Sequence, residues 1–200
     1  MSPLFETIRL KDGVLQNLEL HNSRMNHCRK TLFGAYNPLD LENTIRIPIE
    51  NRQGIYKCKV IYTKNIEKQS FELYTARRIE SLKLVIDDNI TYQYKTTDRS
   101  CLEKLSDQRE KFDDILIIKN GFITDTSFSN IIFHDGSQWL TPSNPLLKGT
   151  MRAYLLKYKL IEEKGIKAED LPLFRKARLI NAMLPFEIGP DIEIENIRFQ

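Results

Sequence analysis

The chain has 200 residues, of which 41% are hydrophobic and 28% are charged, and its formal net charge is +3 at pH 7. This length and composition predict an ordinary folded protein with one domain or two small ones. The charges form no single-sign block or basic stripe, no apolar run approaches the roughly 18 residues that a membrane span needs, and the first residues lack a signal-peptide pattern. We therefore expect no nucleic-acid partner, no membrane partner and a cytoplasmic protein.

The cysteines and histidines are few and widely spaced. Cys28, Cys58 and Cys101 are odd in number and far apart, which predicts no disulfide framework and fits a reducing compartment. The three histidines do not have a spacing typical of metal ligands. The sequence therefore predicts no metal site.

The N-terminal part of the chain predicts a sheet with a helix. Phe5–Leu10 alternates in side-chain character, and Asp12-Gly13 offers a turn into a second strand over Val14–Leu20. The pattern from Asn22 to Phe33 predicts a helix that Gly34 ends. Three further strands are predicted over Ile45–Glu50, Gly54–Thr63 and Ser70–Thr75.

The C-terminal part follows a hinge at Ala76–Ser81 and mixes strands with two helices, Asp98–Lys111 and Gly149–Leu160. Turns are predicted at Asn120-Gly121 and Asp135-Gly136. The predicted strands are Leu82–Ile86, Thr91–Lys95, Ile115–Ile118 and Phe122–Phe133, with Ala177–Met183 and Ile192–Phe199 as strands or loop. We expect an α/β (α+β) fold with a small lobe at 1–78 and a larger lobe at 79–200.

One segment, GFITDTSFSNIIFHDGSQWLTPSNPLLKGTMR at 121–152, carries most of the functional information. It holds an acidic strand residue, a Ser-Asn pair, a Thr-Pro pair after a hairpin, and a Gly-Thr-Met-Arg helix start. This order resembles the signature region of the class IV aminotransferases, the pyridoxal-phosphate (PLP) enzymes of fold type IV. LFETIRLKDG near the N-terminus is similar to the family's F-E-T-x-R-x-x-G. The resemblance covers nearly the whole chain, as a compact version of the family with a barrel-like larger lobe.

The resemblance implies that Lys95 is the lysine that binds PLP covalently. Lys95 begins a K-x-x-x-R segment that ends at Arg99, and it lies 30 residues before Asp125. By itself, a lysine in YQYKTTDR also fits a solvated charge at a strand end. A cofactor-binding lysine must be partly desolvated so that its amine is neutral, and Tyr92 and Tyr94 would supply apolar walls.

Asp125 is the candidate partner of the cofactor's ring nitrogen. Its segment is mostly apolar or small, and an ionised carboxylate buried there needs a cation, which a pyridinium N–H would provide. On the residues alone, a polar residue on an exposed strand face is the alternative. The family usually has Glu at this place, and this chain has Asp with a shorter side chain.

The phosphate of PLP is expected at a helix N-terminus, where free N–H groups and the helix dipole attract anions. The resemblance makes Thr150 and Met151 the donors of the family's G-x-x-R turn, and it makes Arg24, in HNSR, the arginine of H-x-x-R. Asn181 and Ala182 fall where the family has a second phosphate-binding turn. A plain helix N-cap and a surface arginine are the alternatives.

The function implied is a PLP-dependent aminotransferase that moves an amino group between an amino acid and a 2-oxo acid, with a small-molecule amino substrate and a homodimeric assembly. The alternatives are 4-amino-4-deoxychorismate lyase, which eliminates pyruvate, and a non-catalytic relative that has lost PLP. No residue marks the lyase, which favours the aminotransferase by a small margin. Arg77 and Arg78 are either clamps for a substrate carboxylate or charges on the hinge surface.

Overall fold

The computed structural model describes residues 2–200. It contains two compact units, one formed by Met1–Ala76 with Tyr94–Asp98, and the other by Arg77–Gln93 with Arg99–Gln200. The expected mixture of helices and sheets, an α/β fold of the fold-type-IV kind, is confirmed. The segment that carries Lys95 packs with the first unit. The lobes predicted at 1–78 and 79–200 stay a prediction.

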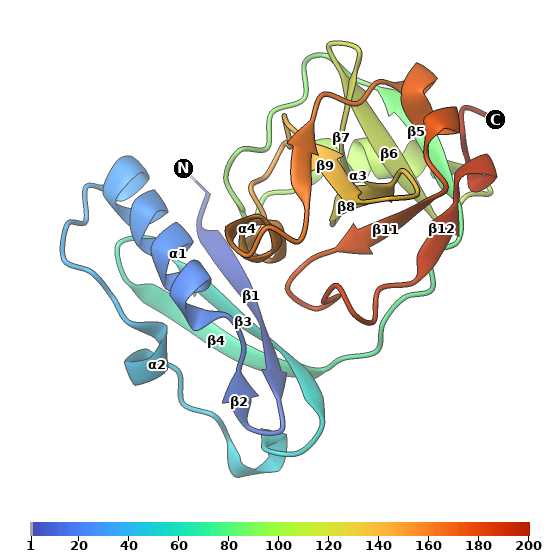
Figure 1. The fold of residues 1–200 in the computed structure, drawn as a ribbon. Coiled ribbons are helices and arrows are strands. Elements are labelled where there is room, and N and C mark those ends of the chain that lie inside the picture. Colours follow the sequence, from blue (N-terminus) through green and yellow to red (C-terminus); the bar gives the residue numbers. More distant parts are fainter. Residues whose placement is uncertain (1) are drawn as a thin grey trace. The chain divides into compact units, whose positions relative to one another are not determined.

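The first unit is an antiparallel sheet covered on one face by a helix. Its strands are β1 (Leu4–Lys11), β2 (Val14–Leu15), β3 (Ile55–Tyr62) and β4 (Ile66–Leu73), in the spatial order β2-β1-β3-β4. Helix α1 (Leu18–Phe33) lies along this sheet, as Figure 1 shows. A short helix α2 (Leu41–Thr44) and a 3₁₀ turn η1 (Ile49–Asn51) precede β3.

Alternation along β1 decides which residues face the helix. Leu4, Ile8 and Leu10 are fully buried and belong to one core cluster with Met25 of α1 and Cys58 of β3. Two predictions are confirmed here: a strand over Phe5–Leu10 and a helix that ends at Phe33. Gly34 ends the helix because its φ of 64° permits its N–H to reach the carbonyl of Lys30.

Three predictions for the first unit were wrong in their bounds or type. The strand predicted over Val14–Leu20 stops at Leu15, because α1 begins at Leu18. Ile45–Glu50 is not a strand, because Ile45 caps α2 and Pro48 leads into η1. β4 begins at Ile66, before the predicted start at Ser70, because an edge strand can be polar on both faces.

The second unit is built on a nine-stranded sheet with the strand path β10-β9-β8-β7-β6-β5-β13. Figure 1 shows its central strands side by side. Off this path, β11 pairs with β8 and β12. The strands are β5 (Leu82–Ile86), β6 (Asp114–Lys119), β7 (Phe122–Thr126), β8 (Asn130–His134), β9 (Trp139–Pro142), β10 (Glu162–Lys164), β11 (Lys176–Ile180), β12 (Asp191–Glu193) and β13 (Ile197–Arg198).

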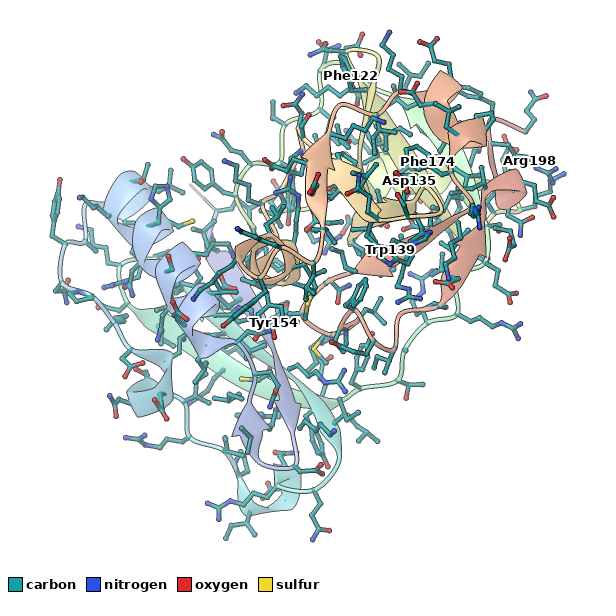
Figure 2. The ribbon with its side chains drawn as sticks, viewed as in Figure 1. Phe122, Asp135, Trp139, Tyr154, Phe174 and Arg198 are labelled. Atoms are coloured by element: carbon teal, nitrogen blue, oxygen red, sulfur yellow. The ribbon has the colours of Figure 1, made fainter. Side chains whose placement is uncertain are left out.

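Short helices connect these strands. They are α3 (Ser100–Ser106), α4 (Thr150–Lys157) and the 3₁₀ turns η2 (Asp107–Arg109), η3 (Ala168–Leu173) and η4 (Ile194–Asn196). The core of the unit includes Phe133 of β8 and Phe174, whose ring centroids are 5.1 Å apart; Figure 2 labels Phe174. Tyr154 extends from α4 in the same view.

Several predicted elements of the second unit are shorter than expected. The run Phe122–Phe133 breaks into β7 and β8, because the Thr126 hydroxyl accepts hydrogen bonds from the N–H groups of Phe128 and Ser129 and forms a local turn. The helix predicted over Asp98–Lys111 ends earlier, with Glu110 at a positive φ of 52°. Thr91–Lys95 contains no strand; an isolated bridge joins Leu4 and Thr96 instead.

Within residues 2–200, no helix is long and apolar enough to cross a membrane. The same residues contain no group of three or more His, Cys, Asp and Glu side chains arranged to hold a metal ion.

Candidate active site

Lys95 lies beside the first strand of the first unit. Its carbonyl accepts a hydrogen bond from the Phe5 N–H at 2.9 Å, and its half-buried side chain places Nζ 4.6 Å from the centroid of the Phe5 ring. Tyr94 packs on the core of the first unit, whereas Tyr92 is part of a core cluster in the second. The aromatic neighbour of the lysine amine in this structure is therefore Phe5, which the sequence analysis did not single out.

Arg24 is held by a buried carboxylate. Its Nε donates to Oε1 of Glu6 at 2.9 Å and its Nη2 donates to Oε2 at 2.5 Å, which is a bidentate pair. Nδ1 of His21 lies 2.6 Å from the same Oε2. Glu6 and His21 are fully buried, so in this network of Glu6, His21 and Arg24 the carboxylate and the imidazole are shielded from water.

The charges in this network follow from its geometry. Burial alone would raise the pKa of Glu6, but Arg24 and His21 outweigh burial and lower that pKa to about 2. Burial lowers the pKa of His21, despite the neighbouring carboxylate. At neutral pH, Glu6 is ionised and His21 is uncharged, so the positive charge of Arg24 is locally compensated.

Asp125 ends up buried in the second unit, at the end of β7. Its Oδ1 accepts from Nδ2 of Asn130 at 2.7 Å, and its Oδ2 accepts from the N–H of Leu147 at 2.9 Å. Burial raises the pKa of Asp125 to about 6, although these two donors and the charge of Arg152 oppose that rise. The carboxylate is thus only partly compensated for the loss of water.

The start of α4 lies against the same asparagine. Gly149 is the residue before the helix, and a Cβ there would lie 2.1 Å from Oδ1 of Asn130, so only glycine fits without a shift. Thr150 and Met151 form the first turn and are buried. Arg152 points inward, donating to the carbonyl of Pro142 at 2.9 Å, and its Nε is buried without a hydrogen-bond partner among residues 2–200.

The loop between β7 and β8 is linked to the second predicted phosphate turn. Nδ2 of Asn181 donates to the Ser129 hydroxyl at 2.7 Å, and Oδ1 of Asn181 accepts from the N–H groups of Met183 and Leu184. The Asn181 side chain therefore shapes its own turn, in which Ala182 is the next residue. Arg99 Nη2 fixes the other end of the loop through the Ser127 carbonyl at 2.7 Å.

The two arginines predicted as carboxylate clamps have different surroundings. Arg77 lies over the ring of Phe128, 5.6 Å from its centroid, and donates to the carbonyl of Asp113 at 3.4 Å. Arg78 is exposed and forms an ion pair with Glu80, two residues away. Of the two, only Arg77 contacts the loop that follows Asp125.

The predicted site residues fall into two sets. Arg24 and Lys95 belong to the first unit, where both act electrostatically on His21. Asp125, Thr150, Met151, Asn181 and Ala182 belong to the second, with Arg77 and Arg78. Sequence analysis missed Glu6 and Asn130. Glu6 could have been found from its place between Leu4 and Ile8 on the buried face of a strand, and Asn130 from the Ser-Asn pair of the signature segment.

Comparison with known proteins shows the family. Residues 3–187 match the family model described as amino-transferase class IV. Because this match spans most of the chain, the protein belongs to the class IV aminotransferase family, and the resemblance found in the sequence is confirmed.

Relatives and solved structures agree with this assignment. The chain is 36% identical to an uncharacterised protein of Haemophilus influenzae over 92% of this chain and 98% of that protein. It is 29% identical to a proposed aminodeoxychorismate lyase of Schizosaccharomyces pombe, over 84% and 80%. The structure of a proposed 4-amino-4-deoxychorismate lyase from Haemophilus somnus superposes with a TM-score of 0.87 at 35% identity, covering 93% and 98%. A proposed amino-acid aminotransferase from Mesorhizobium loti shares the fold, with a TM-score of 0.80 at 17% identity, covering 96% and 99%.

Proposed function

We propose that the protein is a PLP-dependent 4-amino-4-deoxychorismate lyase, which eliminates pyruvate and leaves 4-aminobenzoate. The buried, incompletely compensated carboxylate of Asp125 carries the cofactor part of this proposal. The two relatives at 29% and 35% identity that are named as proposed lyases support the reaction. They outweigh the small margin by which the sequence alone favours the aminotransferase.

The residues present fit PLP. Asp125 accepts hydrogen bonds from the Asn130 amide and from the N–H groups of Leu147 and Leu146, and a carboxylate with about four acceptor positions has room for a further donor, such as a protonated ring nitrogen. That cation would also offset the burial that raises the pKa of Asp125 to about 6. The first turn of α4 would offer backbone N–H groups and the Thr150 hydroxyl to a phosphate.

The proposed roles follow from these chemistries. When bound, PLP supplies an electron sink for the charge that develops at the substrate carbon. Lys95 would hold the cofactor, and its amine would remove a proton from the carbon that bears the substrate amine. Its ammonium then donates a proton to the departing pyruvate group. Asp125 would hold the proton on the ring nitrogen, while Thr150, Met151, Asn181, Ala182 and Arg24 would bind the phosphate.

Transamination is the second candidate, because the family model that matches residues 3–187 is that of the aminotransferases. The same lysine and carboxylate would serve it, with a 2-oxo acid as the acceptor. A homodimer, implied by the resemblance, and a cytoplasmic location, expected from the cysteine usage and the first residues, stay predictions. Light scattering coupled to gel filtration tests the first of these.

The test begins with the purified protein incubated with PLP and reduced with borohydride. A pyridoxyl group on Lys95, located by mass spectrometry, supports the cofactor assignment. The same preparation is then given 4-amino-4-deoxychorismate, and 4-aminobenzoate is measured by its fluorescence. Turnover of amino acids with pyruvate or 2-oxoglutarate, without release of 4-aminobenzoate, would replace the lyase by the aminotransferase. Failure to bind PLP at all would favour the non-catalytic relative.

A further inference from the structure

A second lysine of the first unit lies against the same aromatic ring as Lys95. Nζ of Lys59 is 4.9 Å from the centroid of the Phe5 ring, and Nζ of Lys95 is 4.6 Å from the same centroid. Since both distances are measured from the centroid of the Phe5 ring, the two nitrogens are at most 9.5 Å apart. The face of Phe5 attracts each cation, but the cations repel one another.

Strand register explains why Lys59 reaches this ring. Lys59 on β3 pairs with Thr7 on β1, and Phe5 pairs with Ile61, so Phe5, Thr7 and Lys59 share one face of the sheet. It is the face opposite Glu6, because side chains alternate along a strand. Lys59 is half-buried, which limits how far water can screen its charge.

The same face carries more positive than negative charge. Arg9 pairs in register with Lys57, which pairs in turn with Glu72. Nζ of Lys57 lies 2.6 Å from Oε2 of Glu72, and this hydrogen bond is the main reason that the pKa of Glu72 is lowered; Lys59 contributes least. Glu72 therefore offsets the charge of Lys57 far more than that of Lys59.

Given the proposed function, on which this inference rests, we propose that Lys59 binds a carboxylate of the amino substrate that reacts at Lys95. An ammonium on a flexible stem is a compact donor suited to a carboxylate. Lys59 is then a specificity residue that selects amines bearing a second carboxylate over amines with only one.

Kinetics of the PLP-loaded enzyme test this role with three variants. Lys59→Gln should raise the KM for 4-amino-4-deoxychorismate roughly tenfold to hundredfold, the value of one charge-assisted hydrogen bond, with a much smaller change in kcat. Lys59→Arg should recover most of the loss because it keeps the charge. Lys57→Gln is the matched control on the same strand and face, and its KM should stay close to that of the wild type. An unchanged KM in Lys59→Gln overturns the inference.

Binding of inert probes separates this inference from the proposed reaction. Calorimetry compares benzene-1,3-dicarboxylate with benzoate on PLP-loaded wild type and on Lys59→Gln. The wild type should prefer the dicarboxylate at least about tenfold, and Lys59→Gln should lose that preference while borohydride still attaches the pyridoxyl group to Lys95. A wild type without turnover refutes the proposed lyase, yet these affinities still decide the role of Lys59. Equal binding of the dicarboxylate by the wild type and by Lys59→Gln overturns the inference that Lys59 binds a carboxylate.

Discussion

Replacing Asp125 by Asn should change how the stability of the PLP-free protein depends on pH. Burial raises the pKa of Asp125 from 3.8 to about 6. The unfolded chain therefore releases this proton near pH 3.8, while the folded chain keeps it until about pH 6. Across that window the folded state binds more protons, so the free energy of unfolding falls as the pH rises.

The size of the effect follows from the shift. A rise of about two pKa units, at 1.36 kcal/mol per unit, corresponds to about 3 kcal/mol of stability lost between pH 3.8 and pH 6. The amide that replaces the carboxyl group in Asp125→Asn cannot titrate, so the variant lacks this loss. The amide carries a fixed cost at every pH, because its NH₂ group faces one of the two donors, Asn130 or the Leu147 N–H.

Urea denaturation at pH 3.5, 5 and 7 measures the difference between the two proteins. Other titrating groups cancel because both proteins share them. Relative to the wild type, Asp125→Asn should gain about 3 kcal/mol between the lowest and the highest pH. Added PLP should stabilise the wild type more than the variant at pH 7, since only the carboxylate gains a cation. A difference that stays constant over this range would refute the burial argument.

Three further outcomes are expected. Lys95→Ala should leave no pyridoxyl group after borohydride reduction and mass spectrometry, and a group found on another lysine would contradict the assignment. Thr150→Pro should fold, because proline suits the first position of a helix, yet it should bind PLP at least roughly tenfold more weakly in equilibrium titration. Arg24→Ala should weaken PLP binding by a similar factor. Unchanged affinity in both variants would refute the assignment of the phosphate site. Gly149→Ala should lower the free energy of unfolding by about 1–3 kcal/mol in urea denaturation, since the added Cβ would meet Oδ1 of Asn130 at 2.1 Å. A free energy of unfolding equal to that of the wild type would contradict this packing.

Local sequence rules predicted the elements that depend on local chemistry. The turn at Asn120-Gly121 joins β6 and β7 as expected, with positive φ at both residues, because Asn and Gly adopt that conformation at little cost. The polar strand β4 was misplaced, because its pairing with β3 rather than its own hydrophobicity fixes it. The hydroxyl of Thr126 ends β7 early by accepting hydrogen bonds from the backbone that follows, which periodicity alone does not reveal.

The network of Glu6, His21 and Arg24 does not follow from local rules, because the sequence shows its three residues but not that they contact one another. His21 and Arg24 are three residues apart and share a helix face, and Glu6 occupies the buried face of β1. A carboxylate there requires cationic or hydrogen-bonding partners. The pairing itself depends on how α1 lies on the sheet, which a single sequence does not give.

That pairing changes the expected electrostatics of cofactor binding. Arg24 was predicted as a cation for the phosphate, but Glu6 is ionised beside it, with a pKa of about 2, and compensates its charge. As the proposed phosphate ligand, Arg24 would therefore attract the phosphate only weakly over long range and would contribute mainly a guanidinium fixed in orientation. The uncompensated attraction must come from elsewhere, and the N-terminal turn of α4, with no acidic residue in its first turn, is the group suited to supply it. Affinity for PLP should consequently depend more on the backbone donors at Thr150 and Met151 than the motif H-x-x-R suggests.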